Sequence, residues 1–261
     1  MSRPRLRRKL GQHHLVDGTW CAPSISFLKP FGRRVFEIGP GSGVLTAELL
    51  EAGAEVVACE LDPAWAFAVR RELDSTHLRL VVADALTIKW SRLHEETLVT
   101  GNLPYGVAGE VVLRLLRESS VKHAAFLIQK EVADRLVAQP SDKAYGALTL
   151  LTAMFADVAL LGAVPRAFFR PQPKVDGAFV GITRKLPPVA SEEIDDLSAV
   201  IRIGFAHRRK TLRNACAAQW GRQTAETILD RAGIDPGLRA EVLSLPDFVR
   251  IYRAAQHLIN G

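Results

Sequence analysis

The sequence predicts a doubly wound α/β domain followed by a small helical domain. In the first part of the 261-residue chain, short apolar runs alternate with segments of helical apolar spacing. Strands that alternate with helices are typical of a parallel sheet covered on both faces. At LPPVASEEIDDL the pattern changes to helical segments with little strand signal, which continue to the end of the chain. We therefore expect two domains, residues 1–184 and 185–261.

Five strands are expected in the first domain, each an apolar run bounded by a helix or a turn. Pro63 opens one helix at its first turn, where proline is tolerated, and Gly53 closes the helix before it. In chain order the expected strands are 33–39, 54–62, 78–86, 97–105 and 123–131, and the expected helices are 42–53, 63–74, 109–119 and 131–139.

Two more apolar segments, 157–165 and 177–185, flank the proline-rich sequence RPQPKVD. We expect them to pair as a hairpin that closes one edge of the sheet. The most apolar stretch of the chain, ALTLLTAMFADVALLGAV, is interrupted by Asp157, so no membrane span is expected.

The cysteines and the N-terminal sequence indicate a cytoplasmic protein. Cys21, Cys59 and Cys216 are far apart and form no CxxC pair, which favours a reducing compartment. This spacing predicts neither a disulfide framework nor a metal site. The N-terminal sequence MSRPRLRRKLGQHHLVDG is basic but lacks the apolar core of a signal peptide.

Positive charge is concentrated in two clusters. The net charge is +6, and residues 3–9 and 202–213 carry many Lys and Arg residues but no acid. Clustered cations on a basic chain are typical of proteins that bind a phosphate backbone. A solvated cationic surface is the alternative interpretation of either cluster alone.

A glycine-rich turn follows the first expected strand. The sequence FEIGPGSG places Gly39, Gly41 and Gly43 between this strand and a helix, where glycine lets the backbone approach a ligand closely. The spacing GxGxG differs from the GxGxxG typical of dinucleotide-binding enzymes, which argues against a nicotinamide-dependent dehydrogenase.

Polar residues end the next three strands. Glu60 can accept both hydroxyls of a ribose, an arrangement that serves NAD and S-adenosylmethionine alike. Asp84 and Asn102 end the third and fourth strands. Because the carboxyl ends of neighbouring parallel strands line one crevice, we expect these residues and Gly39 to converge there.

The fourth strand runs into VTGNLPYGVAG, which combines a polar amide, a rigid ring and an aromatic hydroxyl. In isolation these residues fit a helix start, with Asn102 as cap, Pro104 in the first turn and Tyr105 in the core. The glycine turn and the acids at the neighbouring strand ends favour a site that holds a flat ligand instead.

At this point the chain resembles a known family. NLPY together with EIGPGSG is similar to the adenine-amino methyltransferases, which use S-adenosylmethionine. LIQKEVADRLVAQPSDKAYGALTL, VPRAFFRPQPKVDGAFV, FAHRRKTLRNAC and GIDPGLRAEVLS resemble the bacterial 16S ribosomal RNA adenine-N(6) dimethyltransferases of the KsgA type. The resemblance extends from LGQHHL, at Leu10, to the C-terminal helices.

The resemblance implies a Rossmann-like class I methyltransferase sheet with a C-terminal helical domain that binds rRNA. It implies that S-adenosylmethionine donates methyl groups to two adjacent adenines near the 3′ end of 16S rRNA, in the small subunit or its precursor. We expect a monomer with no membrane partner. The alternatives are a macrolide-resistance type methyltransferase of 23S rRNA and an assembly factor with little catalysis.

The resemblance also assigns the reacting groups. An adenine amine is a poor nucleophile because its lone pair is delocalised into the ring, and two acceptors aimed at its hydrogens localise that pair. In the family an Asn side-chain oxygen and a carbonyl at the Pro do this, here Asn102 and Pro104. Tyr105 would stack on the flipped-out base, a contact worth roughly 1–3 kcal/mol, and Phe169 matches the second aromatic of the family.

By the same pattern, His13 and Leu15 line the cofactor pocket beside Gly39, Gly41, Glu60, Asp84 and Asn102. The chain departs from the family here, since the usual FGQNFL has Asn at the position of His13 and aromatics at those of Leu10 and His14. GVAG in place of NIS after the tyrosine is a second departure. In the second domain, the match to RRKTLRN assigns rRNA phosphate contacts to a predicted helix that carries Arg208, Arg209, Lys210 and Arg213.

Overall fold

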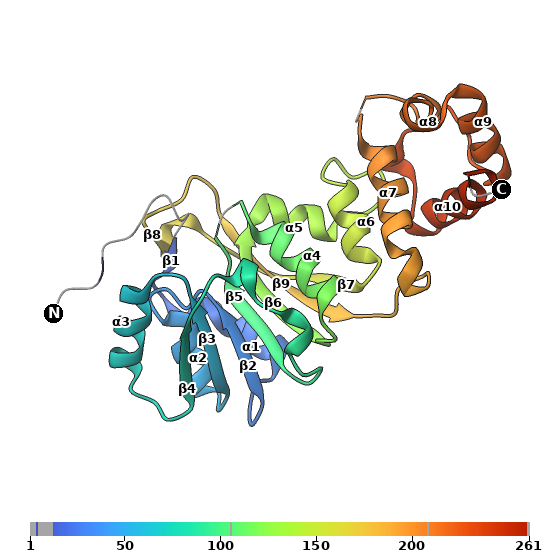
Figure 1. The fold of residues 1–261 in the computed structure, drawn as a ribbon. Helices are drawn as coiled ribbons and strands as arrows, with labels where there is room; N and C mark the ends of the chain where they lie inside the picture. The colour runs from blue at the N-terminus through green and yellow to red at the C-terminus, as the bar shows by residue number, and fades with distance from the viewer. Residues whose placement is uncertain (1–3, 5–12, 105, 208, 260–261) are drawn as a thin grey trace. The chain divides into compact units, whose positions relative to one another are not determined.

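The computed structural model describes residues 4, 13–104, 106–207 and 209–259, and the chain forms two compact units. The first unit comprises residues 1–134 and 156–184, and the second comprises 135–155 and 185–261. Figure 1 shows the sheet of the first unit and the helices of the second. One of the points at which the chain passes between the units lies at the expected boundary, between 184 and 185. Residues 135–155, which the sequence analysis assigned to the first domain, belong to the second unit.

The first unit contains a seven-stranded sheet in the order β4-β3-β2-β5-β6-β9-β7. Strands β2 to β6 are parallel, whereas β9 is antiparallel to both β6 and β7. The five expected parallel strands and the closing hairpin are therefore confirmed. The strands are β2 (Arg34–Ile38), β3 (Glu55–Glu60), β4 (Leu78–Val82), β5 (Leu98–Asn102), β6 (His123–Gln129), β7 (Ala156–Val164) and β9 (Gly177–Arg184).

The strand order reverses between β2 and β5, from which the chain proceeds outward in opposite directions. Because crossovers between parallel strands are right-handed, helices on the two sides of this point cover opposite faces of the sheet. Asp62 caps one of these helices, accepting a hydrogen bond from Ala64 N at 3.0 Å, with Pro63 in the first turn. The helices are α1 (Ala22–Leu28), α2 (Val44–Glu51), α3 (Pro63–Leu73), α4 (Ala108–Glu118) and α5 (Lys130–Val137), the last of which continues into the second unit.

A second, two-stranded sheet was not expected from the sequence. Strand β1 (His14–Leu15) pairs antiparallel with β8 (Phe169–Arg170), so that residues far apart in the chain lie side by side (Figure 1). The pairing continues beyond the strands, where Val16 N donates to Phe168 O at 3.0 Å. This small sheet ties the start of the described chain to the loop between β7 and β9.

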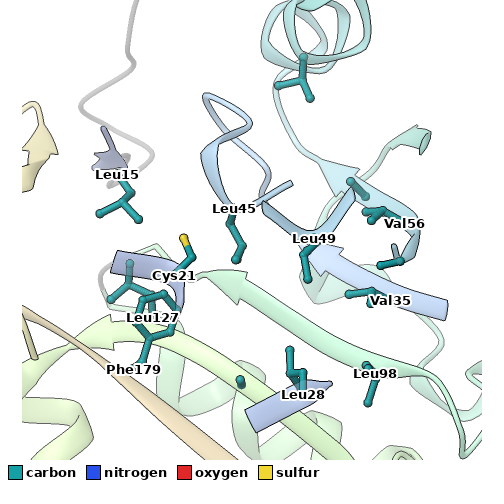
Figure 2. Packing of buried hydrophobic residues seen from close by; sticks show 14 of the residues in the cluster. Leu15, Cys21, Leu28, Val35, Leu45, Leu49, Val56, Leu98, Leu127 and Phe179 are labelled. Carbon is teal, nitrogen blue, oxygen red and sulfur yellow. The ribbon is translucent and has the colours of Figure 1, made fainter. Parts of the chain in front are cut away.

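The main core lies between the sheet and its helices. Figure 2 shows buried side chains of one hydrophobic cluster that come from several strands and helices, including Val35 of β2, Leu49 of α2 and Leu98 of β5. β5 and β6 are buried along nearly their whole length, as expected for strands covered on both faces. The carboxyl ends of these strands are thus supported by rigid packing.

The second unit is helical, as expected. Its helices are α6 (Ala147–Ala153), α7 (Ile194–Phe205), α8 (Leu212–Trp220), α9 (Arg222–Arg231) and α10 (Leu245–Ile259). Tyr145 Oη donates to Leu243 O at 2.7 Å, and Ser141 N donates to Glu241 O at 2.8 Å. These bonds join residues 135–155 to the C-terminal segment and explain why this stretch belongs to the second unit. Within the described part of the chain, no helix combines the length and apolar character that a membrane span requires.

Candidate active site

A cavity of about 330 Å³ opens at the carboxyl ends of the central strands of the first unit. It lies where the strand order reverses, the usual ligand-binding place in such sheets. The structure brings together every residue that the sequence analysis assigned to the cofactor. The lining includes His13, Leu15, Gly39, Gly41, Glu60, Asp84 and Asn102, and Pro104 as well.

The glycine turn lines the cavity with backbone. Gly39 and Gly41 have φ values of +67° and +55°, in the left-handed region that favours glycine. A Cβ on Gly41 would lie 2.9 Å from His14 Nε2, so a side chain there would collide with the imidazole. His14 also lines the cavity, and its ring packs edge-on against that of Trp65, with 4.5 Å between the ring centroids. The turn and β1 therefore approach each other because position 41 lacks a side chain.

Glu60 holds this turn in place. One carboxylate oxygen accepts a hydrogen bond from Gly41 N at 3.1 Å and the other accepts one from Asp62 N at 3.0 Å. The residue is 4% exposed, and burial raises the pKa of its carboxyl although the two backbone bonds act to lower it. A carboxylate offers about four lone-pair positions, so both oxygens can still accept hydroxyl donors from a ligand.

Asp84 follows β4 and begins a short 3-10 helix. Its Oδ1 accepts from Leu86 N at 2.8 Å, which fixes the side chain at the rim of the cavity. Oδ2 accepts no hydrogen bond from a residue that the structure describes. One oxygen thus orders the turn, and the other is left to a ligand donor.

Glu37 lines the same cavity and was not identified from the sequence. It is 1% exposed, and burial raises the pKa of its carboxyl to about 7. Thr46 Oγ1 donates to Oε2 at 2.7 Å, whereas Oε1 has no hydrogen-bond partner among the described residues. A buried carboxylate oxygen without a partner is costly, and a cationic ligand group would satisfy it. The available signal was an acid inside the apolar run RVFEIG, next to the glycine turn.

Asn102 is oriented by the chain itself. Its Nδ2 donates to the main-chain oxygen of His13 at 2.8 Å. Only the amide nitrogen can donate to a carbonyl, so Oδ1 is the atom left to accept, and it accepts from no described residue. The helix-cap interpretation is wrong, because α4 begins at Ala108 and its N-cap is Val107.

The residues on either side of Asn102 fix its backbone. A Cβ on Gly101 would lie 2.4 Å from the main-chain oxygen of Ile38, so glycine lets β5 pair closely with β2 at this point. Pro104 lines the cavity, and its carbonyl accepts from Val107 N at 3.4 Å. This bond is long, and the carbonyl has a second lone pair for another donor. Tyr105 lies outside the described residues.

Phe169 is not brought together with Asn102 and Pro104. The structure places it in the core, 1% exposed and not among the residues that line the cavity. On β8 it pairs with Leu15, and its ring packs so closely on Gly177 that a Cβ there would lie 2.8 Å from Cζ. This position gives no support to a place beside the base, and contact of the Phe169 ring with a base stays a prediction.

The cations assigned to rRNA do not lie on one helix. Helix α7 ends at Phe205 and α8 begins at Leu212, so Arg209 and Lys210, both exposed, lie in the connection between them. Lys210 N donates to His207 O at 3.0 Å, which forms a turn where a helix was expected. Arg213 lies on α8, with Nε 3.3 Å from Glu226 Oε1. Arg208 lies outside the described residues.

The comparisons with known proteins agree with these features. The sequence profile of a family described as ribosomal RNA adenine dimethylase matches residues 3–257. Relatives named ribosomal RNA small subunit methyltransferase A include one from Arthrobacter sp. (strain FB24), 38% identical over 97% of this chain and 88% of the relative. Another, from Thermosynechococcus vestitus, is 38% identical over 97% and 98%, and one from Thermobifida fusca is 42% identical over 83% and 78%.

Two crystal structures share the fold over most of both chains. A dimethyladenosine transferase from Plasmodium falciparum has a TM-score of 0.77 at 23% identity, covering 92% of this chain and 96% of that one. The 23S rRNA methyltransferase ErmE has a TM-score of 0.71 at 24% identity, covering 92% and 98%. These likenesses confirm the predicted class of sheet. With its sequence matched from residue 3 to residue 257, the chain belongs to the ribosomal RNA adenine dimethylase family.

Proposed function

We propose that this protein transfers methyl groups from S-adenosylmethionine to the exocyclic amines of two adjacent adenines in the 3′-terminal hairpin of 16S rRNA. The products are dimethyladenines, formed in the cytoplasm during maturation of the small ribosomal subunit. Relatives named as small subunit methyltransferases, 38–42% identical over most of this chain, support the substrate. The observation that carries the chemistry is the Asn102 amide, whose nitrogen is bound to His13 and whose oxygen is left to accept.

The residues that line the cavity fit S-adenosylmethionine, the cofactor of this family. When bound, it supplies an electrophilic methyl group on a positively charged sulfur. Glu60 can accept the two ribose hydroxyls, and Asp84 Oδ2 can accept from a further donor such as an amine. Glu37 offers the ammonium group its Oε1, which has no hydrogen-bond partner in the described part of the chain, and its negative charge suits a cationic group.

Asn102 and Pro104 act on the target amine. Asn102 Oδ1 and the Pro104 carbonyl each accept one of its two hydrogens, which draws the lone pair out of the ring and aims it at the methyl. The proline ring restricts the backbone that carries the Pro104 carbonyl, and the hydrogen bond to His13 O holds the Asn102 amide. Positioning supplies most of the rate, and the product amine loses its proton to water. Stacking of Tyr105 on the base remains a prediction.

The second unit would hold the rRNA through its phosphates. Arg209 and Lys210 are exposed in the connection between α7 and α8, where their cationic groups are accessible to a phosphate backbone. Arg208 is adjacent in sequence and keeps its predicted role, and Arg213 would have to share its charge with Glu226. Phosphate contacts position RNA without reading its sequence, so the folded subunit would supply the specificity.

The test is transfer of radiolabelled methyl groups from S-adenosylmethionine to small and large ribosomal subunits that lack the modification. We expect dimethyladenine in the small-subunit rRNA. In Asn102→Ala we expect a fall in kcat of about 100-fold, of the order seen when one preorganised polar group is removed from an active site. Calorimetry with the cofactor serves as the control for folding of the variant.

Two outcomes would contradict the proposal. Label in the large subunit would assign the protein to the resistance type of methyltransferase. No label in either subunit, with the cofactor still bound, would indicate a ribosome-binding protein without this chemistry.

A further inference from the structure

The segment that carries His13 is held by three parts of the first unit. The main-chain oxygen of His13 accepts from Asn102 Nδ2 at 2.8 Å, and its Nδ1 lies 2.6 Å from Pro171 O. Two residues later, Leu15 O accepts from Ser42 Oγ at 3.2 Å. The segment thus joins the glycine turn, the end of β5 and the loop after β8.

The carbonyl of His13 determines which way the Asn102 amide is turned. In the observed orientation the nitrogen donates to this carbonyl, and the oxygen accepts from none of the residues that the structure describes, so it is available to a donor. In the rotated orientation two oxygens would meet, and the amide would present hydrogens to an amine that must itself donate. Without the His13 carbonyl in place, the two orientations would differ less in energy, and part of the population would be unproductive.

The imidazole of His13 keeps that carbonyl in place. A carbonyl oxygen has no hydrogen to give, so Nδ1 is the donor to Pro171 O. Pro171 follows β8 directly, and β8 is paired with β1 through His14 and Arg170. The ring bond therefore ties the main chain at His13 to a residue already held by the small sheet.

We propose that His13 is a positioning residue, which acts on the methylation step by holding the Asn102 amide with its oxygen available to the target amine. The proposal rests on the function proposed above and adds to it a residue that does not touch the amine. The resemblance implied instead that His13 is a cofactor ligand. The two roles differ in what they change, because a positioning residue affects kcat and a ligand affects cofactor affinity.

The experiment compares His13→Ala, His13→Asn and the control His77→Ala, which removes an exposed imidazole of the same unit. Asparagine carries an N–H near the position that Nδ1 occupies in histidine, so it can restore the bond to Pro171 O. With saturating cofactor and small subunits, we expect kcat to fall about tenfold in His13→Ala, the effect of one lost hydrogen bond, and to recover to within about threefold in His13→Asn. The dissociation constant of the cofactor should change by less than about threefold in both variants.

A second readout does not depend on catalysis. The side-chain amide protons of Asn102 should be protected from hydrogen exchange in the native protein and in His13→Asn, and should lose protection in His13→Ala. This measurement stands even if the protein methylates a different RNA, so failure of the proposed function is distinguishable from failure of this inference.

Three results would overturn the inference. One is a cofactor dissociation constant that rises about tenfold in His13→Ala while kcat at saturation is unchanged. Another is a loss of kcat that His13→Asn does not restore. The third is an Asn102 amide that exchanges equally fast in the native protein and in His13→Ala.

Discussion

The two ends of the cavity are built in different ways. At the cofactor end, Gly39 follows β2, Glu60 is the last residue of β3, and Asp84 comes shortly after β4, so that each strand places a residue at or near its own carboxyl end. At the base end, Asn102 also ends a strand, but its orientation depends on His13, far away in sequence. The first end is therefore fixed by local chain geometry, and the second by tertiary pairing. Substitutions at the two ends should differ accordingly in what they change.

The largest effect is expected from substitution of Phe169. A core residue should affect thermal stability, whereas a residue that stacks on the base should affect kcat. Truncation of a buried Phe costs about 3–5 kcal/mol, so Phe169→Ala should lower Tm by roughly 10 °C. Phe169→Leu keeps most of the packing and should retain kcat to within about threefold. Calorimetric melting and methyl transfer measure the two quantities.

The control for Phe169 is Phe67→Ala, which removes a ring that is 66% exposed and should leave Tm unchanged. A stable Phe169→Leu variant whose turnover is strongly reduced would contradict a role confined to the core. It would support the predicted contact of the ring with the base.

The second largest effect is expected from substitution of Glu60, which should lower the affinity for S-adenosylmethionine. Hydrogen bonds to a charged group are worth about 1.5–3 kcal/mol, so Glu60→Gln should raise the dissociation constant of S-adenosylmethionine about 100-fold. The amide also places a donor against Gly41 N or Asp62 N, which weakens the turn. At saturating cofactor, kcat should change by less than about threefold. Titration calorimetry and turnover at saturation test the two expectations separately.

Glu55→Gln is the matched control, since Glu55 begins the same strand and its side chain is 61% exposed. Equal losses of affinity in the two variants would mean that the effect of Glu60 is not local to the cavity. A large loss of kcat in Glu60→Gln would contradict the idea that the cofactor end determines affinity and the base end determines kcat.

The difference between the ends also explains what the sequence could predict. Val35 to Ile38 and Leu98 to Gly101 belong to strands buried on both faces, which appear in the sequence as apolar runs, and the polar residue that ends such a run is easily recognised. The two-residue strand β1 has no detectable period, so the pairing of Leu15 with Phe169 could not be predicted. The burial of Phe169 follows from that pairing.

In the second unit, too, the helices could be predicted from the sequence, whereas the connections and long-range contacts could not. Its helices could be predicted from their apolar spacing, but the charged sequence around Arg209 is equally compatible with a helix and with a turn. The structure forms a turn, closed by the bond between Lys210 N and His207 O. Residues 135–155 joined this unit through contacts with Leu243 and Glu241, about a hundred positions along the chain, which no local pattern shows.

The smallest expected effect is the pH dependence of cofactor affinity, which we attribute to Glu37. Folding raises the pKa of Glu37 from an ordinary value of 4.5 to about 7, chiefly through burial, so the group is mostly protonated below pH 7 in the free protein. A protonated carboxyl does not attract an ammonium group. The dissociation constant of S-adenosylmethionine should therefore rise as pH falls below 7, by up to tenfold per unit, the limit for one linked proton. Below about pH 7 nearly all of the α-amino groups of the cofactor are charged, and at pH 7.5 more than half of them still are.

Titration calorimetry between pH 5.5 and 7.5 would measure this dependence, with Glu37→Gln as the variant that cannot titrate. The amide should bind the cofactor more weakly at pH 7.5, and its dissociation constant should depend less on pH than that of the native protein, with Glu60 as the remaining buried acid of the cavity. The raised pKa of Glu37 also makes folding stability depend on pH, and in the opposite direction to cofactor affinity. An acid whose pKa is raised on folding destabilises the native state as pH rises from 4.5 to 7, so Glu37→Gln should gain thermal stability relative to the native protein over that interval. If both proteins showed the same pH dependence of binding, the proton would belong to another group, and Glu37 would serve the turn through Thr46 and not the ligand.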